Sequence, residues 1–279
     1  MSFDKQSKDC PLVMGILNVT PDSFSDGGRY IDPVLAMARV EEMVAAGADI
    51  IDIGGESTRP GAPAVSAADE LERVIPLVGQ ICERFDVMLS VDTSKPAVMR
   101  SAIEAGAGMI NDVFALREPG AVEAVAGSSA QVCLMHMQGE PRTMQENPVY
   151  SNVVAEVGDF LLARAEACLA AGIGRDRIFL DPGFGFGKTL AHNLELMAGL
   201  DKLLELGFPL SVGVSRKSMF GALLGRAVDE RLAGSVAMAA IAAWSGASII
   251  RAHDIAETKD AVCVAAALRG ARKQIRNKT

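Results

Sequence analysis

Short apolar runs alternate with longer stretches of helical periodicity along almost the whole chain. The runs are rich in Val, Ile and Leu and are apolar at successive positions, which favours strands buried on both faces. They predict strands at Leu12–Leu17, Ile50–Ile53, Val87–Val91, Met109–Asn111, Gln131–Met135, Arg177–Leu180, Leu210–Val214 and Ser248–Ile250. The stretches between them predict helices at Pro33–Ala46, Ala68–Arg84, Pro96–Ala105, Pro119–Ala126, Asn152–Ala171, Leu190–Leu206, Glu230–Ser245 and Glu257–Arg272.

A strand followed by a helix, repeated eight times, predicts a parallel sheet with helical crossovers. Eight such units close most simply into a (β/α)8 barrel, the TIM barrel of the α/β class. A doubly wound open sheet is the alternative, because periodicity does not report closure. Glycines suited to left-handed C-caps follow five of the helical stretches: Gly47, Gly106, Gly172, Gly207 and Gly246. No linker divides the chain, so we expect one domain over residues 1–279, with 1–11 as a short N-terminal extension.

Charge and composition narrow the class of partners. The chain has 279 residues, 49% of them hydrophobic, and a formal net charge of -8, which argues against nucleic acid or an anionic membrane surface as a partner. The polar N-terminal stretch lacks an apolar signal core, and no apolar run is long enough to span a bilayer. We expect a cytoplasmic protein. Its five cysteines are scattered without a C-x-x-C pair, which indicates reduced, buried thiols.

Polar residues follow nearly every predicted strand. In a parallel barrel these positions meet at one mouth, where catalytic groups of this fold lie. Ordinary helix capping explains one or two Asp or Asn residues after strands but not the whole set. A convergent polar site is therefore predicted from Asn18, Asp52, Asp92, Asn111, Met135 with His136, Asp181, Ser215, and Arg251 with His253.

The residue types at this mouth indicate a class of ligand. The carboxylates and amide of Asp92, Asn111 and Asp181 suit a planar heterocycle with N–H donors and ring acceptors. Cations at the same mouth of an acidic protein indicate an anionic substrate group: Arg59, Lys217, Arg251 and His253. The run 215–218 begins the segment after the seventh strand, where barrels commonly bind phosphate.

One glycine-rich segment, residues 181–189, is not a nucleotide-binding motif. Pro182 replaces the first glycine of a Walker loop, and the spacing G-x-G-x-G differs from the dinucleotide fingerprint. A flexible loop that brings an aromatic side chain over a ligand is the interpretation that fits this segment.

Eight motifs spread over nearly the whole chain resemble those of bacterial dihydropteroate synthases. The two most specific are Met14–Gly28 (MGILNVTPDSFSDGG) and Asp52–Gly61 (DIGGESTRPG). The others follow in the family order and are Ser90–Pro96, Ile110–Asp112, Leu134–Gly139, Asp181–Lys188, Ser215–Ser218 and Arg251–His253.

The resemblance implies that the chain joins a pterin methyl diphosphate to p-aminobenzoate and releases diphosphate, as a homodimer that uses Mg2+ and that sulfonamides inhibit. Diphosphate leaves easily once its charge is neutralised, and the electron-rich dihydropterin stabilises the remaining cation. An ionisation-first substitution is therefore our hypothesis. The catalytic residues would be Asp92, Asp181 and Lys217.

The resemblance also implies a place for each site residue. The metal would be held by Asn18, whose amide oxygen is a suitable magnesium ligand. The pterin and diphosphate would meet Thr58, Arg59, Asp52, Asp92, Asn111, Met135, Asp181, Lys217, Arg251 and His253. The p-aminobenzoate would meet Thr58, Pro60, Gly185, Phe186, Ser215 and Lys217.

Some positions keep more than one interpretation. Asp112 is better explained as a cap of a turn or helix than as a ligand group, and His136 is equally suited to the core and to the site. Arg216 points away from Lys217 and is left outside the site. The loops Thr20–Ile31 and Gly54–Ala67 are interpreted as mobile lids that close over diphosphate.

Three other functions remain open from the sequence. A corrinoid-dependent methyltetrahydrofolate methyltransferase uses a related pterin-binding barrel, but it has no need of the 58–60 segment or the 215–218 run. A phosphosugar enzyme would share only the phosphate end of the site. A non-catalytic pterin-binding paralogue would be expected to have lost some of the polar set.

Overall fold

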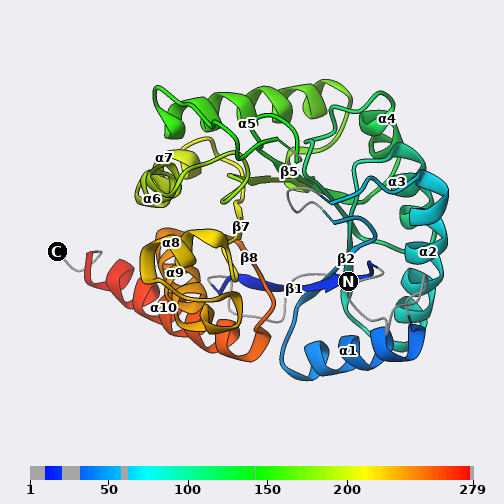
Figure 1. The fold of residues 1–279 in the computed structure, drawn as a ribbon, viewed down its shortest axis with the longest axis horizontal. Coiled ribbons are helices and arrows are strands. Elements are labelled where there is room, and N and C mark those ends of the chain that lie inside the picture. Colours follow the sequence, from blue (N-terminus) through cyan, green and yellow to red (C-terminus); the bar gives the residue numbers. More distant parts are fainter. Residues whose placement is uncertain (1–9, 21–31, 58–61, 142, 277–279) are drawn as a thin grey trace.

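A computed structural model describes residues 10–20, 32–57, 62–141 and 143–276, and these form a ring of strands surrounded by helices (Figure 1). The strands are β1 (Leu12–Asn18), β2 (Ile50–Gly54), β3 (Met88–Asp92), β4 (Met109–Asp112), β5 (Gln131–Met135), β6 (Ile178–Asp181), β7 (Ser211–Gly213) and β8 (Ile249–Ala252). The helices are α1 (Pro33–Ala45), α2 (Ala67–Arg84), α3 (Pro96–Glu104), α4 (Ala121–Ala126), α5 (Val153–Ala170), α6 (Leu190–Ala198), α7 (Leu200–Leu204), α8 (Ser218–Leu224), α9 (Leu232–Ser245) and α10 (Ile255–Arg276).

The strands pair in parallel in the order β6-β5-β4-β3-β2-β1-β8-β7. The two ends of this sheet also meet, because Leu180 of β6 and Leu210, just before β7, form a parallel bridge. Leu180 N donates to Pro209 O at 3.0 Å beside that bridge. The sheet is thus a closed barrel, and the prediction of a TIM barrel is confirmed over an open doubly wound sheet.

Side chains inside the barrel lie in layers. One layer is apolar and takes one residue from each of six strands: Met14, Ile50, Met109, Cys133, Phe179 and Ile249. Alternate residues of a strand point to the same face, so the position two residues further on also faces inward. On four strands that position is polar, namely Asp52, Asn111, Asp181 and Arg251. An apolar floor therefore supports a polar layer at the carboxyl ends of the strands, while the outward faces of the strands pack in the large core beneath the helices.

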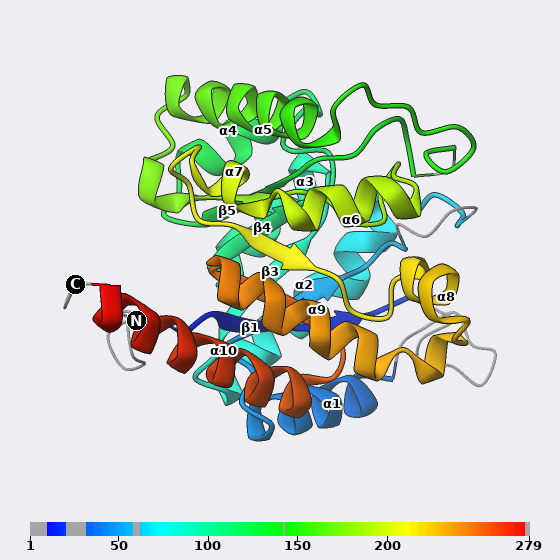
Figure 2. The ribbon, with the colours of Figure 1, turned by 90° about the vertical axis from the view of Figure 1, so that its left-hand side faces the viewer.

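Two helical regions are divided differently from the sequence prediction, and the other helix ends move by a few residues at most. The expected helix Leu190–Leu206 is divided at Gly199 into α6 and α7. A Cβ at Gly199 would lie 2.8 Å from Val154 Cγ2, so glycine permits α5 to approach the junction closely. The seventh unit contains a short helix, α8, before α9, for which the periodicity predicted no separate range. Figure 2 shows α8 beyond the tip of β7, at the mouth of the barrel.

The cysteine prediction was only partly right. All five cysteines are free, and Cys133 and Cys168 are buried, but Cys82 and Cys263 are exposed. Both exposed cysteines lie on helices that form the outer layer of the barrel, where sequence spacing alone did not separate the inward face from the outward one.

None of the described helices is long and apolar enough to cross a membrane.

Candidate active site

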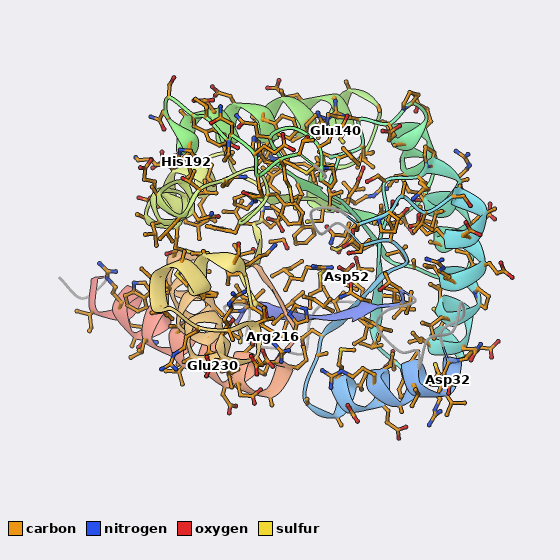
Figure 3. All side chains as sticks on the ribbon, viewed as in Figure 1. Asp32, Asp52, Glu140, His192, Arg216 and Glu230 are labelled. Carbon is orange, nitrogen blue, oxygen red and sulfur yellow. The ribbon has the colours of Figure 1, made fainter. Side chains whose placement is uncertain are left out.

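Asp52 is the centre of a polar cluster at the barrel mouth. Its Oδ2 accepts a hydrogen bond from Asn111 Nδ2 at 3.1 Å and pairs with Arg251 Nε at 2.6 Å. The carboxylate is buried, and a buried carboxylate needs such donors because it has lost its water. Figure 3 shows Asp52 near the centre of the ring of strands, whereas Asp32 and Glu230 lie on the outside. Strands β2, β4 and β8 therefore bring their polar ends together.

Asp92 shares the Arg251 guanidinium with Asp52, with Arg251 Nη2 2.9 Å from Asp92 Oδ2. Burial raises the pKa of Asp92 to about 7, an effect that the Arg251 cation opposes and the Asp52 carboxylate increases. Asp92 therefore changes its charge near neutral pH, as groups at functional sites often do. Asn18 lies on the other side of β2, since a Cβ at Gly54 would lie 3.6 Å from Asn18 Oδ1 and 3.7 Å from Asp92 Cβ.

Asp181 and Lys217 form the opposite side of the polar layer. Burial raises the pKa of Asp181, although its Oδ1 accepts a hydrogen bond from Gly183 N at 2.7 Å, which opposes the rise. Burial lowers the pKa of Lys217 to about 8; the Arg251 cation adds to this effect and the Asp181 carboxylate opposes it. Lys217 Nζ also lies 4.2 Å from the centroid of the Phe186 ring, a favourable cation–π distance.

Ser215 and His253 form a hydrogen-bonded pair where β7 and β8 end. Ser215 Oγ lies 3.0 Å from His253 Nδ1 and accepts from His253 N at 3.2 Å. Burial and the nearby Arg251 cation lower the pKa of His253 to about 4. The sequence suggested a cationic His253, whereas the structure makes it a neutral hydrogen-bonding group at pH 7.

Arg216 separates the two site residues Ser215 and Lys217 and points away from them, as predicted. Its φ of 56° lies in the left-handed region, which is unusual for a residue with a side chain. The strained backbone is held by a salt bridge from the Arg216 side chain to Asp254 and by a 2.8 Å hydrogen bond from Arg216 N to Ser235 Oγ.

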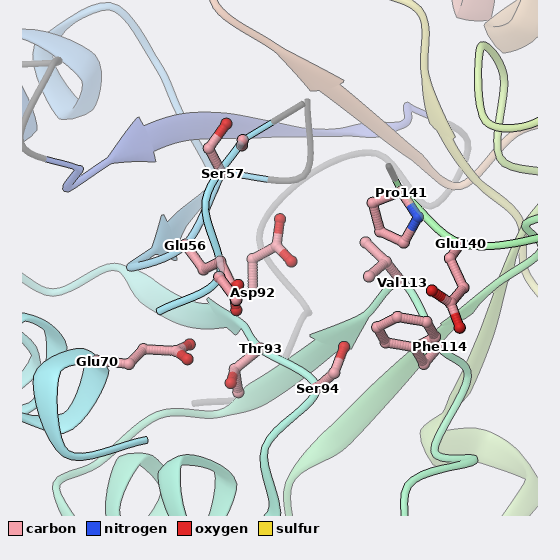
Figure 4. Close-up of a pocket in the computed structure, with 12 residues that line it drawn as sticks. Glu56, Ser57, Glu70, Asp92, Thr93, Ser94, Val113, Phe114, Glu140 and Pro141 are labelled. Carbon is pink, nitrogen blue, oxygen red and sulfur yellow. The ribbon is translucent and has the colours of Figure 1, made fainter. Parts of the chain in front are cut away.

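A cavity opens beside Asp92, between the segments that follow β2, β3, β4 and β5 (Figure 4). The close-up shows the Asp92 carboxylate directed into this space, with Val113, Phe114 and Pro141 on the opposite wall. Sequence reasoning did not select Val113, because an apolar residue after a strand is not distinguishable from core. In the structure Val113 packs with Met135 in a small buried apolar cluster behind this wall.

The glycine-rich segment after β6 is held by many hydrogen bonds and does not have the features of a flexible loop. Asn193 Oδ1 accepts from Gly185 N at 2.7 Å, and the Tyr150 hydroxyl donates to Gly187 O at 2.8 Å. Lys188 donates to Gly183 O at 2.9 Å and Phe186 O at 3.0 Å. The segment therefore has a defined hydrogen-bonded shape, and its expected flexibility remains a prediction.

Two undecided residues now have structural explanations. Asp112 is fully buried and accepts hydrogen bonds from Phe114 N at 2.8 Å and Leu116 N at 2.7 Å, which confirms that it caps a turn. His136 is buried with its Nδ1 3.0 Å from Lys188 Nζ, so it belongs to the support of the glycine-rich segment.

Three predicted site residues, Thr58, Arg59 and Pro60, lie outside the described residues, as do most of the first predicted lid and the centre of the second. Among the described residues, no group of three or more His, Cys, Asp or Glu side chains is arranged to bind a metal ion.

Comparison with known proteins identifies the class. The family described as pterin binding enzyme matches residues 14–253. The dihydropteroate synthase of Escherichia coli (strain K12) is 54% identical over 266 residues, which cover 95% of this chain and 94% of that protein. A crystal structure of Yersinia pestis dihydropteroate synthase with a sulfonamide drug complex has a TM-score of 0.90 at 53% identity and covers 95% of this chain and 96% of that one. A Xanthomonas albilineans dihydropteroate synthase with 4-aminobenzoic acid has a TM-score of 0.88 at 52% identity, covering 94% of each chain.

The chain therefore belongs to the pterin-binding enzymes. Within that family its place is among the dihydropteroate synthases, which are transferases of folate biosynthesis.

Proposed function

We propose that the chain transfers the pterinylmethyl group of (7,8-dihydropterin-6-yl)methyl diphosphate to the amine of p-aminobenzoate, giving 7,8-dihydropteroate and diphosphate. The observation that carries this proposal is the polar layer above the apolar barrel floor. Asp92, Asn111 and Asp181 come from three strands and face one space, where they can meet the N–H donors and ring acceptors of a pterin. The pKa shifts of Asp92, Asp181 and Lys217 support a functional role for this layer.

The mechanism that suits these groups is an ionisation-first substitution. The bond between the methylene carbon and the diphosphate oxygen breaks, and the positive charge spreads into the dihydropterin ring. Buried carboxylates at Asp92 and Asp181 stabilise that charge because fixed anions act strongly in a site with little water. The amine nitrogen of p-aminobenzoate then attacks the methylene carbon, and its proton passes to water.

The diphosphate would be held by groups at the open side of the polar layer. Arg251 supplies a guanidinium with the geometry for phosphate oxygens, while the neutral His253 supplies a hydrogen bond. Arg59 and Thr58, outside the described residues, would complete this contact. Arg251 also pairs with Asp52 and Asp92, so it links the diphosphate end of the substrate to the carboxylates beneath the ring.

Magnesium is proposed as the cofactor, bound through Asn18. The residues fit this metal, because Mg2+ prefers a few oxygen ligands together with phosphate oxygens, and the Asn18 amide oxygen lies at the mouth beside Gly54 and Asp92. When bound, the ion supplies charge neutralisation of the leaving diphosphate. Loss of turnover with a chelator and its recovery with Mg2+ would support this assignment, whereas full turnover without divalent cations would reject it.

The p-aminobenzoate would lie between the glycine-rich segment and the start of α8. Gly185 and Phe186 form one wall, Lys217 stands between that wall and the pterin, and Ser215 would meet the carboxylate. Pro60 and Thr58, outside the described residues, would close the other side. Sulfonamides resemble this substrate, and the Yersinia pestis relative carries one, so we propose that they bind here too.

The test is a diphosphate-release assay with pterin diphosphate and Mg2+, with and without p-aminobenzoate, together with direct detection of dihydropteroate. Product only when both substrates are present is the expected result. Asp181→Asn should lower kcat at least about a hundredfold, since one electrostatic contact to a transition state typically contributes that much. Release of diphosphate without dihydropteroate, or unchanged kcat in Asp181→Asn and Asp92→Asn alike, would contradict the proposal.

A homodimer in the cytoplasm is the proposed state of the enzyme. Helices α9 and α10 pack side by side (Figure 2). They expose several large apolar side chains, namely Leu232, Ile241, Trp244, Val264 and Leu268. Exposed apolar groups on neighbouring helices are typical of contact surfaces.

The proposed location in the cytoplasm is supported by the five free cysteines, which suit a reducing compartment. Cell fractionation tests this location directly.

A further inference from the structure

Lys188 is a buried lysine without a described carboxylate partner at salt-bridge distance. Its side chain is only 3% exposed, yet its ammonium group lies 3.0 Å from His136 Nδ1, 2.9 Å from Gly183 O and 3.0 Å from Phe186 O. An ammonium group has three N–H donors. The three acceptors therefore satisfy it completely, and all of them belong to the glycine-rich segment or to the strand end beneath it.

The state of His136 agrees with this arrangement. Because an ammonium group can only donate, Nδ1 of His136 accepts a hydrogen bond from Lys188 and carries no proton, so the ring is neutral. Burial and the Lys188 cation lower the pKa of His136 to about 3, which keeps the ring neutral throughout the physiological range. Burial also lowers the pKa of Lys188, to about 7, with the Asp181 carboxylate opposing the effect, so the three-donor ammonium form predominates below that pH.

The two carbonyls that Lys188 contacts enclose the residues of the proposed p-aminobenzoate wall. Gly185 lies between these two carbonyls in the sequence, and a Cβ at Gly185 would lie 3.1 Å from Lys217 Cδ. The ring of Phe186 faces Lys217 Nζ. Gly183, Gly185 and Gly187 all have positive φ, so this backbone has little conformational preference of its own. Contacts from outside the turn must determine its shape.

We propose that Lys188 is a positioning residue that fixes the Gly183–Phe186 turn and thereby the p-aminobenzoate wall. This inference rests on the proposed function for its kinetic consequence. The Lys188 ammonium holds the turn through hydrogen bonds to the backbone carbonyls at its two ends, and its charge also acts on Asp181 and Lys217. Loss of the Lys188 ammonium group should weaken the binding of p-aminobenzoate and sulfonamides. The affinity for the pterin, which binds on the Asp92 and Asn111 side, should stay the same.

The test replaces Lys188 with methionine, which keeps the length and apolar stem but none of the donors. We expect the KM for p-aminobenzoate and the sulfonamide Ki to rise about tenfold, with the KM for the pterin diphosphate essentially unchanged. Lys202→Met is the matched control, because Lys202 is exposed on α7 and pairs only with Glu205 among the described residues. Equal changes in both KM values, or none, would overturn the proposal.

Two further measurements keep the proposal testable if the variant folds poorly or the wild type makes no product. Tyr150→Phe removes only the hydroxyl that donates to Gly187 O, and we expect a smaller rise in the KM for p-aminobenzoate.

Hydrogen exchange of the Gly185–Gly187 amides can be measured without enzyme activity. It should be faster in Lys188→Met than in wild type, and unchanged exchange would reject the role of Lys188 even if the synthase activity is confirmed. Absence of product from the wild type would instead reject the proposed function alone.

A second inference comes from a pair of thiols away from the mouth. Cys10 Sγ and Cys263 Sγ lie 3.5 Å apart, although the residues are 253 positions apart in sequence. Cys10 precedes β1 at the amino end of the barrel, and Cys263 is exposed on α10. Both are free, and their sulfur atoms are close enough to bond after a small side-chain rotation.

We infer that this pair is an oxidation site for a small disulfide such as glutathione disulfide. The exposed Cys263 thiolate attacks one sulfur of the oxidant and displaces one thiolate. Cys10 then attacks Cys263 Sγ, displaces the second thiolate and completes a protein disulfide, with both cysteine protons taken up by the two released thiols. Cys263 reacts first because it is exposed, whereas Cys10 is partly buried, and burial together with the Cys263 thiol raises the pKa of Cys10 to about 11.

Incubation with glutathione disulfide followed by alkylation under denaturing conditions tests this inference. We expect a chain that is lighter by two hydrogen atoms and has no disulfide to another chain, with Cys10 and Cys263 protected from alkylation. The Tm should be higher because the bond closes a very long loop. Cys263→Ser should abolish both effects, while Cys82→Ser, which removes an exposed thiol elsewhere, should keep them. Stable glutathione adducts on Cys263 without the internal bond would overturn the proposal.

Discussion

The paired titration of Asp92 and Lys217 leads to a pH dependence. The proposed mechanism needs Asp92 ionised and Lys217 protonated. The pKa of Asp92 is raised to about 7 by burial, so kcat/KM should fall as the pH drops below that value. The pKa of Lys217 is lowered to about 8, so kcat/KM should also fall above it. A narrow bell-shaped profile, measured with the pterin diphosphate as the varied substrate, is expected.

Lys217→Arg separates the two limbs of this profile. Arginine stays charged at all accessible pH values, so the alkaline limb should disappear while the acid limb near pH 7 remains. Absolute kcat/KM is expected to be lower, because arginine has a different shape, but the comparison concerns only the profile. An alkaline limb that persists in Lys217→Arg would show that another group controls it.

Asp112 should be essential for stability although it touches no proposed substrate. Asp112→Ala removes the acceptor of Phe114 N, Leu116 N and the Ser94 hydroxyl in a fully buried place. We expect a loss of about 3 kcal/mol from these unpaired donors, which corresponds to a fall in Tm of roughly 9 °C for a chain of this size. Asp159→Ala, on the exposed face of α5, is the control and should leave the Tm within about a degree.

Residues differ in how well the sequence predicts them. Asp52, Asn111 and Arg251 were identified because a polar group that ends an apolar strand is visible in the sequence itself. Lys188 was missed as a functional residue, because its importance lies in carbonyl groups and in His136, which are brought to it only by folding. The neutral state of His253 was also missed, since it depends on burial and on Arg251, which the sequence does not place.

The turn after β6 gives a prediction at the level of an element. Gly183 has a φ of 68°, and a Cβ there would lie 1.9 Å from His136 O, which is a backbone atom that cannot easily move. Gly183→Ala should therefore destabilise the protein by more than about 2 kcal/mol and shift the Gly185–Phe186 wall. Thermal unfolding and the KM for p-aminobenzoate measure the two effects.

Gly127→Ala is the matched control for this substitution. Gly127 has a negative φ of -76°, and a Cβ there would meet no atom within 4 Å. The Tm of the Gly127→Ala variant should be unchanged or slightly higher, since alanine reduces the conformational entropy of the unfolded chain. Equal Tm values for the two variants would contradict the explanation based on the close approach of β5 and β6.

Most elements were predictable because most strands are predominantly apolar runs and many helices are bounded by polar residues or glycine. All eight predicted strands exist in the described residues, and their ends move by no more than two positions. The division at Gly199 was not predictable, because its cause is the side chain of Val154 on another helix. Tertiary packing of this kind leaves no local pattern, whereas the left-handed glycines that follow α1, α3, α5, α7 and α9 were recognisable as helix ends from the sequence.

In the whole molecule, the closed barrel places the proposed substrate site and the surface for contacts with other chains in different regions. The carboxyl ends of the strands present Asp52, Asp92 and Asp181 in one space, and the apolar layer beneath them closes the barrel interior. The outer face of the helices is then free to form contacts with other chains. A substitution on this outer face should therefore change assembly without a direct effect on the polar layer.

Val264 on α10 offers the test of the proposed homodimer. It is 61% exposed, and Val264→Asp would place a charge on the α9–α10 face, where burial without a partner is costly. Light scattering after gel filtration should show the wild type as a dimer and Val264→Asp as mostly monomer. Val34→Asp is the matched control, since Val34 is 74% exposed on α1 and lies outside this face. A monomeric wild type, or a dimer that both variants retain, would assign the exposed apolar groups of α9 and α10 another role.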